Sequence, residues 1–355
     1  MHDPRWPEQD HVTTKLSTAE RLQLQDSQVK NAKAYIEEQQ LAIAGIPGTR
    51  FQTAEEAKEL RSRVDCWTRG QWVEKPKRLR LEHFQDPTYK QKEDKDRELR
   101  WEPTCPFQSG ETVNPSRWCE ALKGRNILLV GDLVHYQLHE VFLDTLRDGP
   151  TVCYGELNCK DHTLCTEPQV VLRYLRNDVL STNRNIDLAG GHPSADVVTW
   201  PFMANYILPK YQILILNRAP ILEDDTQFIR ELTQTMIAIR KAVPNMLIIY
   251  RSTSIGHPYC DEAQGPLMSY LKDEELRRLP YGWSEVSRRN ALARVIVEAA
   301  GGLFVDLAAM TDLRPDGHVG GQDCLRYRIP GPLDAWVEVL YEVFLALESP
   351  GKMDG

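Results

Sequence analysis

The chain has 355 residues, of which 41% are hydrophobic and 26% charged, a composition typical of a folded protein with a buried core. Its 51 Asp and Glu against 43 Lys and Arg give a formal charge of -8, which argues against a nucleic-acid binder because phosphate neutralisation needs clustered surplus cations. The longest apolar runs fall far short of the roughly 20 residues that cross a bilayer, so we expect no membrane span.

The N-terminal part, residues 1–64, predicts a helical extension. Apolar residues recur at helical spacing from Leu16 to Ile36, and Ser17 with Glu20 forms the pattern of a capping box. We expect this arm to pack on the core or on a partner, with a homodimer through its helices as the partner alternative.

Residues 65–120 form a cysteine-containing lead-in, and within it residues 75–100 are rich in charge and poor in aliphatic side chains, which predicts an exposed connection. From residue 121 to 350, short apolar strands alternate with amphipathic stretches. This alternation predicts an α/β domain with a parallel sheet. The predicted strands are Asn126–Val130, Gln212–Leu216, Met246–Tyr250 and Gly302–Asp306.

Polar residues follow each predicted strand. In open parallel sheets, ligands bind at the carboxyl ends of the strands, so these residues define a site hypothesis on their own. They are Asp132 after the first strand, Asn217 and Arg218 after the second, Arg251 after the third, and Asp316 and His318 beyond Asp306 at the fourth.

Eight cysteines are present without a CxxC metal pair, and Met1–Asp10 is polar with no apolar core of a signal peptide. The chain as it stands therefore suits the cytoplasm, whereas the even cysteine count suits a secretory lumen if a leader was removed. Cys153, Cys159 and Cys165 could bridge to each other or to Cys105.

Several motifs, in order, resemble the trichome-birefringence-like/PC-esterase family, a branch of the SGNH (GDSL) hydrolases. They are residues 66–73 (CWTRGQWV), 100–105 (RWEPTC), 122–132 (LKGRNILLVGD) and 323–331 (DCLRYRIPG), followed by Asp334 and Trp336. The local sequences of residues 250–258 and 314–318 are similar to those of fungal members. The resemblance implies a three-layer α/β/α fold and enzymes that transfer or remove O-acetyl groups on polysaccharides.

The resemblance also implies a Ser nucleophile after Gly-Asp, an Asp-x-x-His pair that activates it, and an oxyanion Asn. This sequence keeps Asp132, Asp323 and Asn217 at these places, but Leu133 stands at the Ser position and Arg326 at the His position. Leucine has no nucleophilic atom, and an arginine cannot act as a base. We therefore expect no Ser-dependent acyl transfer.

Three further residues complete the predicted catalytic set, and among them His318 could replace the missing base. His135 lies two residues past the lost Ser, and Asp316 with His318 puts an acid and a base in one loop, although Asp316 could simply stabilise that loop. With Asp132 and Asp323, they make up the predicted catalytic set. His135 and His139, four apart on a helix, are an alternative metal pair without a third ligand.

Arg326 and Arg328 are two apart and point to one side of an extended segment, so with Arg218 or Arg251 they predict a cationic clamp for phosphate or carboxylate. The alternative is that Arg326 pairs with Asp323. We expect no cofactor, with Mg²⁺ at Glu223, Asp224 and Asp225 as an alternative to a helix N-terminus there.

The favoured interpretation is an enzyme that acts on a small or carbohydrate-like substrate in the strand-end cleft without a Ser nucleophile. One alternative is a lyase, cyclase or isomerase for an anionic small molecule, with Asp132 and His318 as acid and base and the arginines as anchors. The other is a non-catalytic binding or regulatory protein.

Overall fold

A six-stranded sheet forms the centre of the computed structural model, which describes residues 15–74, 99–110, 113–146, 161–182, 197–276, 278–321 and 323–348. Five strands run parallel and β4 is an antiparallel edge strand. In spatial order the strands are β4 (His162–Thr166), β5 (Gln169–Arg176), β3 (Ile127–Gly131), β6 (Ile213–Leu216), β7 (Leu247–Arg251) and β8 (Leu303–Val305).

The chain leaves β3 first toward β5 and later toward β6, so β3 lies where the strand order reverses. Ile127 is in register with Leu172 of β5 on one side and Ile213 of β6 on the other. In sheets of this kind, the crevice outside the carboxyl ends of the strands at this reversal is the usual ligand site. The polar residues that follow the strands therefore gather at one edge of the sheet.

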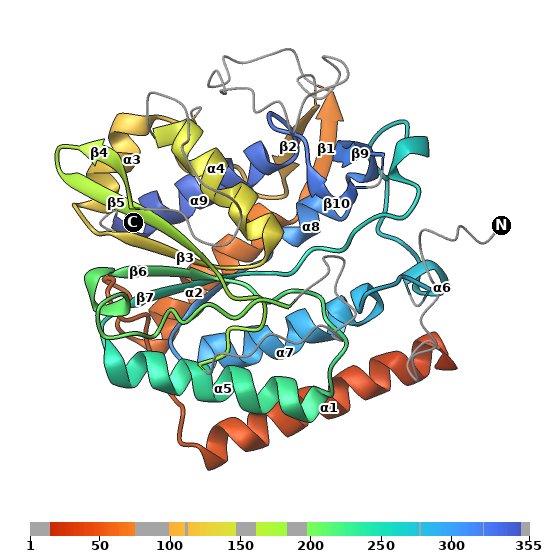
Figure 1. The fold of residues 1–355 in the computed structure, drawn as a ribbon, viewed down its shortest axis with the longest axis horizontal. Coiled ribbons are helices and arrows are strands. Elements are labelled where there is room, and N and C mark those ends of the chain that lie inside the picture. Colours follow the sequence, from red (N-terminus) through yellow and green to blue (C-terminus); the bar gives the residue numbers. More distant parts are fainter. Residues whose placement is uncertain are drawn as a thin grey trace.

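Helices cover both faces of the sheet, which confirms the predicted three-layer α/β/α fold (Figure 1). Side chains alternate along each strand, so Ile127 and Leu129 face one layer while Leu128 and Val130 face the other. The first layer holds α2 (Ala54–Thr68), α3 (Pro115–Leu122), α4 (Leu133–Leu146) and α9 (Leu333–Glu348). The second layer holds α1 (Thr18–Glu38), α5 (Asp225–Ala242) and α7 (Val286–Ala299).

The N-terminal helices join these two layers on opposite faces. The capping box of Ser17 and Glu20 is confirmed at the start of α1, whose Ala32 and Ile36 are buried in the core that α5 and α7 share. Helix α2 packs instead against α9 and β8 through Leu60 and its neighbours. A homodimer through these helices stays a prediction.

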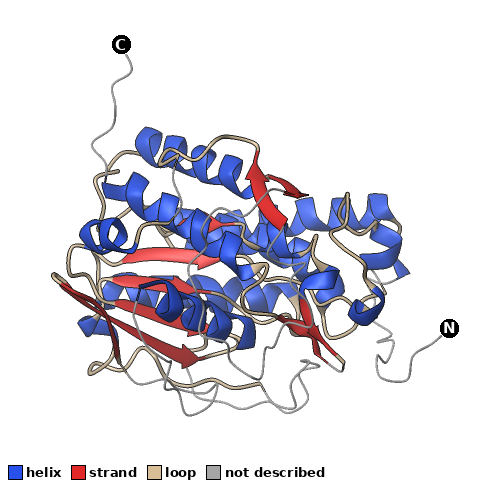
Figure 2. Cartoon of the chain, turned by 90° about the horizontal axis from the view of Figure 1, so that it is seen from above, coloured by secondary structure: helices blue, strands red, loops and turns tan. Residues whose placement is uncertain are grey.

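The remaining elements are short and lie around the sheet (Figure 2). Of the predicted exposed connection 75–100, residues 75–98 lie outside the described part, whereas Leu99 and Arg100 begin a strand. The short strands are β1 (Gly70–Glu74), β2 (Leu99–Pro103), β9 (His318–Gly320) and β10 (Asp323–Tyr327). The short helices are η4 (Leu208–Lys210), η5 (Cys260–Glu262), α6 (Asp273–Leu276), η6 (Trp283–Glu285), α8 (Ala308–Thr311) and η7 (Pro315–Gly317).

Three disulfides join described cysteines, namely Cys66–Cys105, Cys119–Cys165 and Cys260–Cys324. The predicted bridges of Cys165 and Cys105 were therefore wrong, because each of these cysteines lies beside a partner that is distant in sequence. Cys153 and Cys159 lie outside the described residues. Within the described part of the chain, no helix is both long and apolar enough to cross a membrane.

Candidate functional site

A closed polar cluster lies at the carboxyl ends of β3, β6 and β7. The Asp132 carboxylate accepts hydrogen bonds from Arg251 Nη2 at 3.0 Å and from Asn217 Nδ2 at 3.1 Å, while its amide donates to Asn217 Oδ1 at 3.0 Å. A Cβ at Gly131 would collide with Asn217 Oδ1, so the close approach of the two strand ends requires glycine there. The predicted convergence of these strand ends is thus present.

His135 completes the closed cluster with both ring nitrogens in use. Nε2 lies 3.0 Å from the carbonyl of Ile215, to which it must donate, and Nδ1 accepts from Arg251 Nε at 3.2 Å. These contacts suit the neutral ring, and burial together with the charge of Arg251 lowers its pKa to about 3. In this arrangement His135 carries its one proton toward a carbonyl.

The closed cluster is sealed from solvent. The exposed fraction is 4% for Asp132 and 0% for His135, Asn217 and Arg251, and Leu133 at the lost Ser position is 7% exposed. Burial would raise the pKa of Asp132, but Arg251 and the hydrogen bonds from His135 and Asn217 outweigh it and lower that pKa. A buried ion pair with all its hydrogen bonds made is a structural unit, and substrate does not reach it in this structure.

The arginines predicted as a clamp have separate partners. Arg326 Nε donates to Asp323 Oδ2 at 2.6 Å, whereas Arg328 donates to the backbone carbonyls of Asp316 and His318. The alternative pairing of Arg326 with Asp323 is therefore the one observed.

Arg218 and the acidic triplet after β6 are also engaged. Arg218 Nη2 contacts Glu223 at 2.7 Å, Asp224 caps helix α5, and Asp225 pairs with Arg288 at 2.9 Å. Searched within the described ranges, no group of three or more His, Cys, Asp or Glu is arranged to hold a metal ion. Magnesium at the triplet stays a prediction, and each carboxylate would have to leave its present partner to bind it.

The second half of the predicted catalytic set lies around η7 and β9. Asp316 accepts from Arg314 at 2.8 and 2.9 Å. His318 is 1% exposed, and its Nε2 lies 2.8 Å from Nδ1 of His257. The structure thus groups Asp316 with His318, and both residues are held by contacts that do not involve the closed cluster.

An open cavity of about 540 Å³ lies further along the same sheet edge, beside β8. The two acidic residues that line it, Asp306 and Asp312, flank the single turn of α8, and both are half-buried. A volume of this size is typical of small-molecule sites. We call this space the β8 cavity.

Asp306 follows β8 directly. Its carboxylate receives a hydrogen bond from the hydroxyl of Ser252, which itself accepts from the amide of Ala308 at 2.8 Å. Burial is the main cause that raises the pKa of Asp306. The sequence predicts Asp306 at the end of a strand, but we assigned the site residues of that strand end to Asp316 and His318 and gave Asp306 no role.

Asp312 was missed by sequence reasoning. Its Oδ1 accepts from the amide of Ile255 at 3.1 Å, and burial, reinforced by the charge of Asp306, holds its pKa well above the usual value. A negative charge on Asp306 therefore favours the protonated form of Asp312. The only signal in the sequence is an aspartate six residues after a strand-end aspartate, and turns commonly contain such a residue.

Helix α1 helps to close the β8 cavity. Gln25 lines it, and Arg21 holds the segment over it by donating to the carbonyl of Ser284 at 2.7 Å and pairing with Asp273 at 2.9 Å. The N-terminal helix therefore contributes to the wall of the cavity.

No known protein family matches the chain, and no curated protein matches it either. Among solved structures, the periplasmic domain of a lipopolysaccharide acetyltransferase from Salmonella ser. Paratyphi A matches with a TM-score of 0.37 and 12% identity. That match covers 65% of this chain and 90% of that chain. It is too distant to carry an inference about the site, so the resemblance to PC-esterases stays a prediction.

Proposed function

We propose that the protein is an enzyme on a divergent SGNH-like scaffold that performs acid–base catalysis in the β8 cavity, without a Ser nucleophile. The observation that carries this proposal is the pair of half-buried carboxyl groups, both with raised pKa values, on one cavity. A carboxyl group whose pKa is raised keeps its proton to a higher pH than usual, so it is suited to exchange protons with a substrate.

The two carboxyl groups have different roles in this proposal. Asp312, whose pKa is raised further, donates a proton to a leaving oxygen, and ionised Asp306 takes a proton from the attacking water. One C–O bond breaks and one forms to the water oxygen. The leaving oxygen takes the proton of Asp312, one hydrogen of the water stays on the new hydroxyl group, and the other goes to Asp306, from which exchange with solvent returns a proton to Asp312.

The cavity wall favours a neutral, carbohydrate-like substrate. Both aromatic and polar residues line it, including Trp283, Tyr270 and Gln25, and sugars present both apolar faces and hydroxyl groups. Of the arginines on the wall, Arg294 is bound to Asp65 at 2.8 Å. Arg69 also lines the wall, so two acidic residues stand against the charge of one arginine that has no carboxylate partner among the described residues and one that is already paired, a balance that disfavours an anionic substrate.

The three disulfides support an oxidising compartment as the place where this enzyme works.

The proposal is tested by turnover of neutral oligosaccharides and p-nitrophenyl glycosides, followed by mass spectrometry and p-nitrophenol release. We expect Asp306→Asn and Asp312→Asn each to lower kcat by about 100-fold or more, because each loses its proton transfer. Asp261→Asn is the matched control, since Asp261 binds the amide of Gly321 outside the cavity and should keep full activity.

A wild-type chain that cleaves none of these substrates, or cavity variants with wild-type rates, would contradict the proposal. A rise in Tm with pyrophosphate that Arg326→Ala abolishes would favour the anionic alternative. The absence of both turnover and such a rise in Tm would favour a binding protein.

A further inference from the structure

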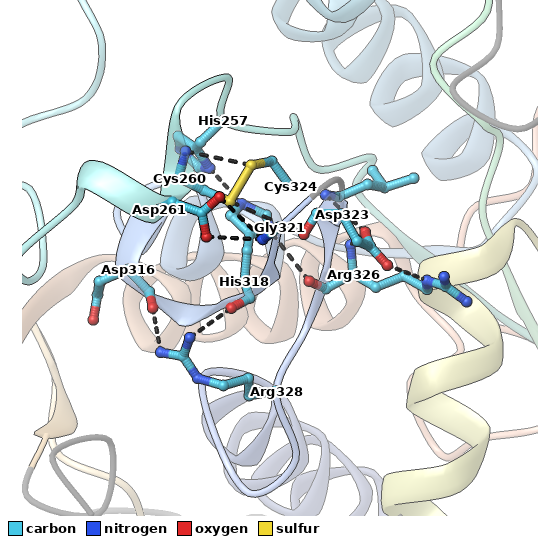
Figure 3. The surroundings of a disulfide bond; sticks show 11 residues. His257, Cys260, Asp261, Asp316, His318, Gly321, Asp323, Cys324, Arg326 and Arg328 are labelled. Carbon is cyan, nitrogen blue, oxygen red and sulfur yellow. Dashed lines mark hydrogen bonds and ion pairs between the residues drawn. A yellow bond between two sulfur atoms is a disulfide. The ribbon is translucent and has the colours of Figure 1, made fainter. Parts of the chain in front are cut away.

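Two buried histidines meet ring to ring behind the β8 cavity. His257 Nδ1 and His318 Nε2 are 2.8 Å apart, and each outer nitrogen faces a backbone carbonyl. His257 Nε2 lies 3.0 Å from the carbonyl of Asp312. His318 Nδ1 lies 3.2 Å from the carbonyl of Arg326, and Figure 3 shows His257, His318 and Arg326 together. The four contacting groups form one chain of hydrogen bonds from β10 to Asp312.

This chain of hydrogen bonds needs three protons on the ring nitrogens of the two histidines. A carbonyl oxygen only accepts hydrogen bonds, so both outer nitrogens must carry hydrogen. A neutral imidazole has one N–H, and two neutral rings would therefore place two bare lone pairs 2.8 Å apart between His257 and His318. Either a third proton lies between the rings, or one buried carbonyl loses its donor at a cost of about 1–3 kcal/mol.

The surroundings hold the two rings in this arrangement. The disulfide Cys260–Cys324 ties the His257 loop to β10, and the amide of His257 donates to the carbonyl of Cys324 at 3.0 Å. The ring of His318 stacks on Tyr327 with centroids 4.4 Å apart. With only 3% and 1% of the two histidines exposed, water does not readily replace either contact.

Charged groups on the neighbouring elements act on the pair in opposite directions. Burial lowers the pKa of both histidines, to about 4 for His257. Repulsion from His257 and from Arg328, which follows β10, lowers the pKa of His318 further. The carboxylate of Asp316 in η7 and the carbonyl of Asp312 favour the proton on His257. Arg326 contacts His318 through its backbone carbonyl, whereas its guanidinium is paired with Asp323.

We propose that His257 and His318 form a binding site for one shared proton, and that this proton positions Asp312 in the β8 cavity. The histidines are positioning residues, because they hold the backbone of Asp312 and do not themselves touch the cavity contents. When the proton leaves, one of the two carbonyl contacts is lost, either the one to Asp312 or the one to Arg326, and the chain of hydrogen bonds that holds the turn of Asp312 is broken. The catalytic consequence rests on the proposed function, whereas the shared proton does not.

The direct test is proton and nitrogen NMR of the full chain with ¹⁵N-labelled histidine between pH 4 and 8. We expect a strongly deshielded shared proton between the two rings, with both outer nitrogens protonated, and its loss above a single transition. The internal control is His135, whose contacts need only one proton, so it should stay neutral throughout. Two neutral rings without a shared proton at every pH would overturn the proposal.

His318→Gln sharpens the test. A glutamine amide can donate to His257 Nδ1 without titrating, so the neutral His257 keeps its bond to Asp312. The shared proton should vanish and the Nε2 resonance of His257 should no longer change with pH, whereas in wild type it moves through the transition. Should this variant fail to fold, the wild-type spectra decide alone. Should Asp312→Asn leave turnover unchanged while the shared proton is present, only the proposed function fails.

Discussion

The carboxyl groups at the two ends of one sheet edge lie in opposite environments. In the closed cluster, Asp132 is sealed and paired with Arg251, so its charge is neutralised inside the protein. In the β8 cavity, Asp306 and Asp312 are half-buried, face open space and have raised pKa values. Motif resemblance points to the first region, but of the two only the second combines raised carboxyl pKa values with an open cavity.

The largest effect is expected in the closed cluster. Arg251→Met leaves the buried Asp132 carboxylate unpaired, which should lower the free energy of unfolding by about 3–5 kcal/mol in urea denaturation. Arg326→Met is the matched control, because its pair with Asp323 is 28% and 21% exposed and should be worth roughly 0–1 kcal/mol. Equal losses in the two variants would show that the two pairs are buried alike.

The two regions should also respond to pH with opposite signs. His135 has a folded pKa of about 3 against 6.5 when unfolded, so the unfolded chain gains protons first and stability falls as pH drops below 6.5. The slope approaches about 1.4 kcal/mol per pH unit for such a group. Asp306 and Asp312, with raised pKa values, stabilise the fold below pH 3.8 and lose that contribution as pH rises through their folded values.

Urea midpoints of wild type and of the double variant Asp306→Asn, Asp312→Asn across pH 4–8 separate the two effects. The double variant should lose less stability than wild type as pH rises and keep the acid-induced loss. A double variant with the wild-type pH profile would mean that the cavity carboxyls titrate normally.

The smallest effect is expected from restoring the lost residues. Leu133→Ser with Arg326→His should release no acetate or p-nitrophenol from simple esters, because position 133 is only 7% exposed and Arg251 fills the space beside Asp132. Stability should change by no more than a typical substitution, about 1 kcal/mol. Ester turnover by this variant would show that the closed cluster can still open to substrate.

The fold was predictable where the residues carry a strong pattern. The runs Ile127–Val130 and Ile213–Leu216 are buried on both faces, so their continuous apolar character indicates parallel strands. The antiparallel β4 and the short hairpin β1–β2 were not predicted, since their strands are half-exposed and mixed in composition.

The site was predictable only in part. That Asp132, Asn217 and Arg251 converge follows from their places at strand ends, but that they close on each other depends on side-chain packing. Asp312 escaped notice because its raised pKa comes from burial and from Asp306, and neither is visible in a linear sequence. The local sequence pattern predicts where the strands end, whereas the tertiary environment determines the pKa of the carboxyl groups at those ends.

The most direct test compares the reactivity of the carboxyl groups themselves. Carbodiimide activation with a nucleophilic amine attacks accessible, protonated carboxyls, and mass spectrometry of the native protein near neutral pH reads each position. We predict that Asp306 and Asp312 are modified faster than exposed Asp261, while Asp132 is protected. Modification of Asp132 at the rate of Asp312, or an unreactive β8 cavity, would contradict this division of the sheet edge into a sealed and a reactive region.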